Sequence, residues 1–258
     1  MVYQTLNKYL HHVNSVFLSF YFLSYTIVGI VSVNSAQVYA QISDEMEFAY
    51  SVKAQGFSLG KLITNISKKG ELYTIESTTK PNGMVAFILG GEAVDHCEYS
   101  LGPEKQMIGK SYTSHKDGKS SYHASLDYDW DQRQIIYNDN NIEKMPHGYI
   151  LDNCNFYVAV ALSGLRFFKE HRIYVFDAKE ARYREFQFAS VENETLSIKL
   201  GKFETQKLTL VRADNPDRRL TFWLSEGHPY SPLMVVDQRK NKKTVLKLIA
   251  YDSQGSFD

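Results

Sequence analysis

From residue 45 onward, the sequence is a succession of short runs in which apolar and polar residues alternate. The first run, Glu45–Ala54, has its apolar side chains at Met46, Phe48, Tyr50 and Val52. A period of two is typical of a strand with one buried and one exposed face. Strands of this kind in series, with no helices alternating between them, favour an antiparallel β architecture.

Turn-forming residues separate these runs. Asp117-Gly118 lies between Gln106–His115 and Ser120–Trp130, and Asp-Gly between alternating runs is typical of a β-hairpin. Lys240-Asn241-Lys242 separates the last two runs in the same way. We therefore predict roughly ten strands joined by short turns. The other runs are Lys61–Ser67, Glu71–Thr78, Gln134–Tyr137, His171–Phe176, Arg182–Val191, Thr195–Leu200, Lys207–Arg212, Arg219–Leu224, Leu233–Arg239 and Lys243–Tyr251.

One segment departs from this alternation and predicts a helix over residues 152–168. Asp152 is a suitable N-cap, because its carboxylate can accept the free amide hydrogens of the first turn. Arg166 and Lys169 suit the negative end of the helix dipole. The predicted fold is mainly β: a curved antiparallel sheet that forms a barrel or half-barrel around this one helix. We expect a single domain covering residues 41–258.

The first forty residues have the order of a secretory signal peptide. Lys8 precedes the uncharged apolar run Val16–Val31, and Val38-Tyr39-Ala40 follows. This order predicts a signal peptide of residues 1–40, cleaved between Ala40 and Gln41. The alternative is an uncleaved N-terminal anchor, since the apolar run is close to the length needed to span a bilayer. No second long apolar stretch exists, so we predict no membrane span after the signal peptide is removed.

Cys97 and Cys154 are the two cysteines of the chain. In an oxidising compartment such a pair can form a disulfide. The alternative is two buried thiols that pack as small hydrophobic side chains. No CxxC motif is present, so nothing indicates thiol–disulfide exchange as a function.

Charge and motifs exclude several classes of function. Lys+Arg and Asp+Glu are both 29, so no basic excess exists to bind a phosphate backbone, and we predict no nucleic-acid partner. No GxGxxG or P-loop sequence is present, and we predict no cofactor. The histidines form neither HxH nor HExxH, and the Asp127–Asp131 segment lacks the EF-hand Gly and Glu, so we predict no metal site.

The sequence places no GxSxG motif in a turn between a strand and a helix, where a serine hydrolase carries it, so we predict no catalytic residue and favour a non-enzymatic protein. A hydrolase whose residues come together only in space stays open as an alternative.

The order of several segments resembles DUF3108, a bacterial family of exported proteins of unknown function. Asp127-Tyr128-Asp129-Trp130 closes a strand, and a helix follows that begins at Asp152 and ends at Leu165-Arg166. The further matching segments are Arg172–Asp177, Tyr183–Phe188, Gly201-Lys202-Phe203, Arg219–Leu224 and Ser231–Met234. The resemblance implies a periplasmic location in a Gram-negative bacterium and a curved antiparallel sheet around the helix. Such shapes are similar to carriers of lipids or lipoproteins, and the resemblance implies no catalytic residues.

Large aromatic residues at strand ends and the apolar side of the predicted helix are the candidate ligand-binding residues. Aromatic side chains near the mouth of a barrel can line a lipid cleft or stack on sugars. We predict an envelope-assembly protein that binds an apolar or amphipathic ligand, such as a lipid or a lipoprotein-like acyl chain. The alternative is an interaction protein that contacts envelope polysaccharide or another protein. The candidate residues are Tyr128, Trp130, Phe156, Val160, Arg166, Trp223 and Tyr230.

Overall fold

The structure is a computed structural model that describes residues 45–83, 85–86, 91–118, 121–228 and 230–252. The predicted signal peptide and the cleavage site between Ala40 and Gln41 lie outside the described residues. Within the described part, no helix is long and apolar enough to cross a bilayer.

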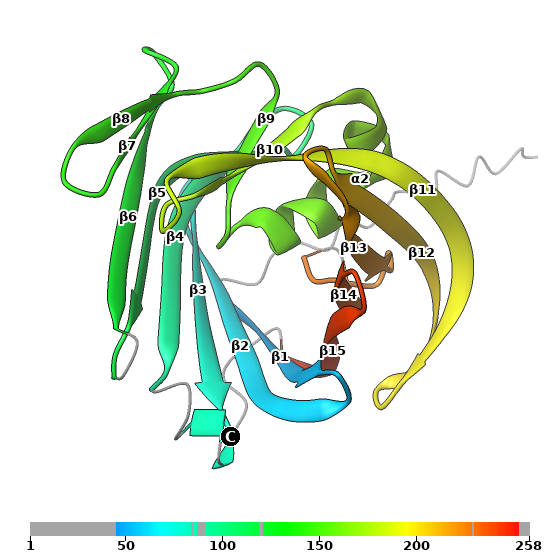
Figure 1. The fold of residues 1–258 in the computed structure, drawn as a ribbon. Helices are drawn as coiled ribbons and strands as arrows, with labels where there is room; N and C mark the ends of the chain where they lie inside the picture. Colours follow the sequence, from blue (N-terminus) through cyan, green and yellow to red (C-terminus); the bar gives the residue numbers. More distant parts are fainter. Residues whose placement is uncertain (1–44, 84, 87–90, 119–120, 229, 253–258) are drawn as a thin grey trace, which may run out of the picture. The chain divides into compact units, whose positions relative to one another are not determined.

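In the described residues, fifteen strands form one sheet (Figure 1). The strands are β1 Glu45–Ala54, β2 Phe57–Lys69, β3 Leu72–Pro81, β4 Ala93–Leu101, β5 Met107–Lys116, β6 Tyr122–Asp129, β7 Gln134–Tyr137, β8 Asn141–Lys144, β9 Tyr149–Asp152, β10 Ile173–Asp177, β11 Arg182–Ile198, β12 Gly201–Arg212, β13 Asn215–Leu224, β14 Met234–Arg239 and β15 Lys242–Asp252. Their spatial order is β8-β7-β6-β5-β4-β3-β2-β1-β15-β14-β13-β12-β11-β10-β9. The first and last strands, β1 and β15, therefore pair in the middle of the sheet.

The sheet curves around the helix α2 (Phe156–Glu170) but does not close, because its edge strands β8 and β9 are not paired with each other (Figure 1). The prediction of a mainly β fold with a curved sheet around one helix is confirmed, in the form of an open barrel. One pair departs from the antiparallel pattern: β9 and β10 are parallel. A parallel pair needs a crossover connection, and α2 provides it.

The predicted bounds of the helix are wrong at both ends. Asp152 is the last residue of β9, and the N-cap is Asn155. The Asp152 carboxylate still accepts backbone N–H groups, those of Cys154 and Asn155, but it does so in the turn before the helix. The helix also continues past Phe168 to Glu170, and it is interrupted at Gly164, whose φ of 70° suits a residue without a Cβ.

The predicted strands differ from the observed ones in two ways. The runs Arg182–Val191 and Thr195–Leu200 were expected as separate strands, yet β11 runs through Glu192-Asn193-Glu194 without a turn. Asn193 pairs directly with Gln206 of β12 there, so the ladder is maintained. In addition, β4, β8 and β9 were not predicted.

The hydrophobic core lies between α2 and the concave face of the sheet. Cross-strand register aligns one apolar row over five strands: Ile66, Ile75, Cys97, Tyr112 and Leu126. All five side chains are buried. On the other half of the sheet, the Phe156 ring of α2 packs against Phe186 and Phe222. The helix therefore joins the two halves of the sheet through a shared core.

Candidate ligand-binding cavity

A cavity of about 260 Å³ lies between the start of α2 and the concave face of the sheet. Strands β1 to β4 form one side of it, and β14 and β15 contribute to the other. Most of the lining is apolar. Its polar side chains include those of Thr64, Ser77, Thr79 and Asp95 on β2, β3 and β4, and that of Asn153 before α2. The lining residues are Phe48, Tyr50, Val52, Leu62, Thr64, Ser77, Thr79, Asp95, Asn153, Cys154, Tyr157, Val158, Tyr230, Pro232, Val235 and Leu246.

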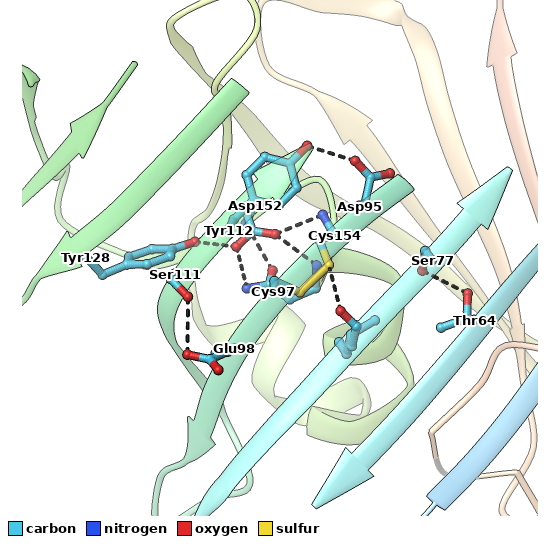
Figure 2. Close-up of a disulfide and its surroundings, with 12 residues drawn as sticks. Thr64, Ser77, Asp95, Cys97, Glu98, Ser111, Tyr112, Tyr128, Asp152 and Cys154 are labelled. Carbon is cyan, nitrogen blue, oxygen red and sulfur yellow. Dashed lines mark hydrogen bonds between the residues drawn. A yellow bond between two sulfur atoms is a disulfide. The ribbon is translucent and has the colours of Figure 1, made fainter. Parts of the chain in front are cut away.

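The polar lining is a row of side chains in register across neighbouring strands. Thr64 pairs with Ser77, Ser77 with Asp95, and Asp95 with Ser114. The hydroxyls of Thr64 and Ser77 are 2.9 Å apart and hydrogen-bonded (Figure 2). This polar row runs beside the apolar row of the core, so the concave face changes from apolar to polar over one step of the pleat.

Among the described residues that line the cavity, Asp95 is the one with a formal charge. The Tyr112 hydroxyl donates to Asp95 Oδ1 at 3.1 Å (Figure 2). Burial raises the pKa of the Asp95 carboxyl, while hydrogen bonds from Ser114 and Tyr112 act in the opposite direction. A carboxyl in an otherwise uncharged, mostly apolar cavity is poorly solvated, and a ligand that donates to it would relieve that penalty.

A disulfide and a buried carboxyl fix the chain where it enters α2. Cys97 of β4 and Cys154 are joined by a disulfide with Cα atoms 6.2 Å apart. The Asp152 carboxylate is fully enclosed and accepts from the Tyr128 hydroxyl at 2.7 Å and from the Asn155 side-chain amide at 2.9 Å. Burial raises the pKa of Asp152 to about 6, against the opposing effect of these donors. Together these contacts hold Asn153 and Cys154 at the cavity wall.

The same three side chains are the one group of potential metal ligands among the described residues. Donor atoms of Cys97, Asp152 and Cys154 lie within 4.8 Å of one another. Metal binding by cysteine requires a free thiolate, and these two sulfur atoms are bonded to each other. The donor set therefore does not fit a metal ion while the disulfide is intact.

Two of the predicted ligand-binding aromatics stack on each other away from this cavity. The rings of Tyr128 and Trp130 are 5.6 Å apart and nearly parallel. Tyr128 donates to Asp152, and Trp130 Nε1 donates to the Gly109 carbonyl at 2.8 Å. Trp130 lines a second hollow, of about 810 Å³, beside Tyr149 and Phe167.

The other predicted residues are dispersed. Tyr230 lines the cavity, whereas Phe156 and Val160 of α2 are buried in the hydrophobic core of the protein. Trp223 faces the side of the sheet opposite Phe222, where Lys207 lies over its ring. The Arg166 side chain is 89% exposed and forms an ion pair with Glu170 of its own helix. The structure thus brings one of the seven predicted residues to the cavity.

The polar row was not identified from the sequence. The sign of such a row in the sequence is a polar residue at a position where the alternation predicts an apolar one. Ser77, between the inward-facing Ile75 and Thr79, is an example. One such residue is unremarkable, because strands tolerate Thr and Ser. Only the register shows that Thr64, Ser77 and Asp95 are neighbours.

Comparison with known proteins gives a family and a related fold. The model of the family described as "Protein of unknown function (DUF3108)" matches residues 49–245. No curated protein matches the chain. Among solved structures, the chain is similar to the "Crystal Structure of Beta-barrel-like Protein of Domain of Unknown Function DUF1849 from Brucella abortus". The identity is 11% and the TM-score 0.46, over 82% of this chain and 98% of that one.

Proposed function

The chain belongs to the DUF3108 family of proteins of unknown function, and we propose that it binds one apolar or amphipathic molecule in the cavity beside α2 without catalysing a reaction. The observation that carries the proposal is the cavity itself. It is lined mainly by apolar side chains in the middle of the fold, with a polar row on one side. This is the usual composition of a small-molecule site.

The size of the cavity suits part of a lipid. A dry apolar cavity of roughly 150 Å³ holds a benzene ring. A cavity of about 260 Å³ therefore has space for a larger ring or a short alkyl chain. Because the lining residue Thr79 is exposed, the cavity reaches the surface, and a longer chain would not need to fit entirely inside.

We place this activity in the periplasm of a Gram-negative bacterium, in assembly of the cell envelope. Two features support that location. The apolar run Val16–Val31 followed by Val38-Tyr39-Ala40 is the order of an export signal. The Cys97–Cys154 disulfide suits an oxidising compartment. The alternative location is on the membrane surface, tethered by an uncleaved N-terminal anchor.

The proposal is tested by blocking the cavity. Thr79 is an exposed residue that lines it, whereas Thr78 is its neighbour on β3 and faces the other side of the sheet. We expect Thr79→Trp to abolish binding of the neutral apolar dye N-phenyl-1-naphthylamine. Thr78→Trp is the matched control and should bind as the wild type does.

Native mass spectrometry of protein purified from a periplasmic fraction supplies the second measurement. Co-purified lipid that Thr79→Trp lacks would support the proposal. A ligand-free mass, together with dye binding that is absent or equal in both variants, would contradict it. That result would favour the alternative of a protein that contacts envelope polysaccharide or another protein.

A further inference from the structure

We propose that the cavity selects a ligand with a cationic or neutral polar head group, such as an amine or a hydroxyl, and rejects anionic head groups. The proposal rests on the proposed function and specifies its ligand. Its basis is the position of Asp95, which is the one formally charged residue among the described residues of the lining.

The polar row gives the head group a defined place. The row of Thr64, Ser77, Asp95 and Ser114 crosses four neighbouring strands in register. Thr64 and Ser77 are buried and hydrogen-bonded to each other. Each hydroxyl can both donate and accept, so this pair can serve an alcohol or an amine. Figure 2 shows Asp95 beyond Ser77, with the Tyr112 hydroxyl on one of its oxygens.

The apolar part of the lining gives the tail its place. On β1 and β2 the cavity is lined by Phe48, Tyr50 and Leu62. The neighbouring strands β15 and β14 add Leu246 and Val235. The start of α2 adds Tyr157 and Val158. A ligand with its head at Asp95 would therefore have its alkyl chain among aliphatic and aromatic side chains, where burial is favourable.

The other charged groups around Asp95 lie outside the described lining of the cavity. The second buried carboxyl, Asp152, is close enough that Asp95 raises its pKa. A positive charge on His115 acts on Asp95 and lowers the pKa of its carboxyl. Farther along the inner wall, Asp237 accepts from Arg218 at 3.1 Å and from Arg239 at 3.4 Å. Asp237, Arg218 and Arg239 do not line the cavity.

An anionic head group in this cavity would meet a carboxylate, with no cation among the described residues of the lining. Like charges a few ångströms apart in a poorly hydrated site repel strongly, and opposite charges attract equally strongly. A carboxylate or phosphate head group is therefore disfavoured, while an ammonium group gains both the charge of Asp95 and the hydroxyl acceptors of the row. We expect the affinity for a neutral alcohol to lie between those for the anion and the ammonium group.

The test uses three ligands that share one alkyl chain: decylamine, decanol and decanoate. Each is used to displace the neutral dye N-phenyl-1-naphthylamine at pH 8, well above the ordinary pKa of a carboxyl. We expect the wild type to bind decylamine about tenfold or more tightly than decanoate, with decanol between them. Asp95→Asn keeps the shape of the side chain and should bring the three affinities close together.

The matched control is Asp127→Asn, which removes one negative charge from an exposed position on β6. It should keep the wild-type preference. Equal displacement by decylamine and decanoate in the wild type, or a preference that survives Asp95→Asn, would overturn the inference while leaving the proposed function intact. Failure of the wild type to bind the dye and all three ligands would overturn both.

Discussion

Removal of the Cys97–Cys154 disulfide should lower the stability of the fold by a predictable amount. The two cysteines are 57 residues apart in sequence. For a closed loop of that length, the chain-entropy model gives about 4 kcal/mol of stabilisation. In a chain of this size, that corresponds to a fall in Tm of roughly 8–16 °C. Both sulfur atoms are buried, so Cys97→Ala/Cys154→Ala is the suitable change because it leaves no unpaired hydroxyl inside.

The assay is urea unfolding followed by tryptophan fluorescence and circular dichroism, with and without a phosphine reductant. We expect the free energy of unfolding of the oxidised wild type to exceed that of the double Ala variant by about 4 kcal/mol. The reductant should bring the wild type close to the variant and leave the variant unchanged. A difference below about 1 kcal/mol between oxidised wild type and variant would refute the loop argument.

Three further predictions concern the buried carboxyl beside the disulfide. Because burial raises the pKa of Asp152 to about 6 from 3.8, its contribution to stability is full below pH 4 and is lost as pH rises through 6, by about 3 kcal/mol; Asp152→Asn should remove that fall from urea-unfolding profiles between pH 4 and 7. Tyr128→Phe removes a 2.7 Å hydrogen bond to this carboxylate and should destabilise the fold by about 1.5–3 kcal/mol at pH 8, and less at pH 4. Gly109→Ala should lower the free energy of unfolding by about 1–3 kcal/mol, since the added Cβ would overlap the Tyr128 ring.

Each of these predictions has an outcome that would contradict it. A wild-type stability profile that rises between pH 4 and 6 more steeply than that of Asp152→Asn would show that the carboxyl is better solvated than its surroundings indicate. An equal loss of unfolding free energy for Tyr128→Phe at both pH values would show that the strength of this hydrogen bond does not depend on the ionisation of Asp152. A neutral Gly109→Ala would mean that the Tyr128 ring is free to move.

Strands and hairpins were predictable where the apolar runs and the turn residues between them agree. The hairpin around Lys240 forms as expected, because two apolar runs flank a polar turn. The prediction failed at Glu192-Asn193-Glu194, where polar composition indicated a turn. Those residues lie in the part of β11 that pairs with β12, and the side chains of Glu192 and Asn193 are exposed. Exposure therefore explains the polar composition as well as a turn would.

The site was less predictable than the fold, since it depends on register. Trp130 and Trp223 were chosen for size and for their place near strand ends. Size does not determine which face of a strand a residue occupies, and a shift of one position exchanges the two faces. The polar residues of the lining, such as Thr64, Ser77 and Asp95, are short and come from three strands. Nothing in the linear sequence places them side by side.

The helix start was misplaced for a reason that bears on the cavity. Asp152 was expected to cap α2, and its carboxylate does bind two backbone N–H groups, but it lies four residues before the first residue of the helix. The extra turn lets Cys154 reach Cys97 of β4 and lets Tyr157 and Val158 face the cavity. If Asp152 capped the helix directly, those side chains would point elsewhere around the helix axis. The buried carboxyl and the disulfide therefore determine the wall of the cavity as well as the stability of the fold. Loss of the disulfide should consequently weaken ligand binding even at urea concentrations where the variant remains folded.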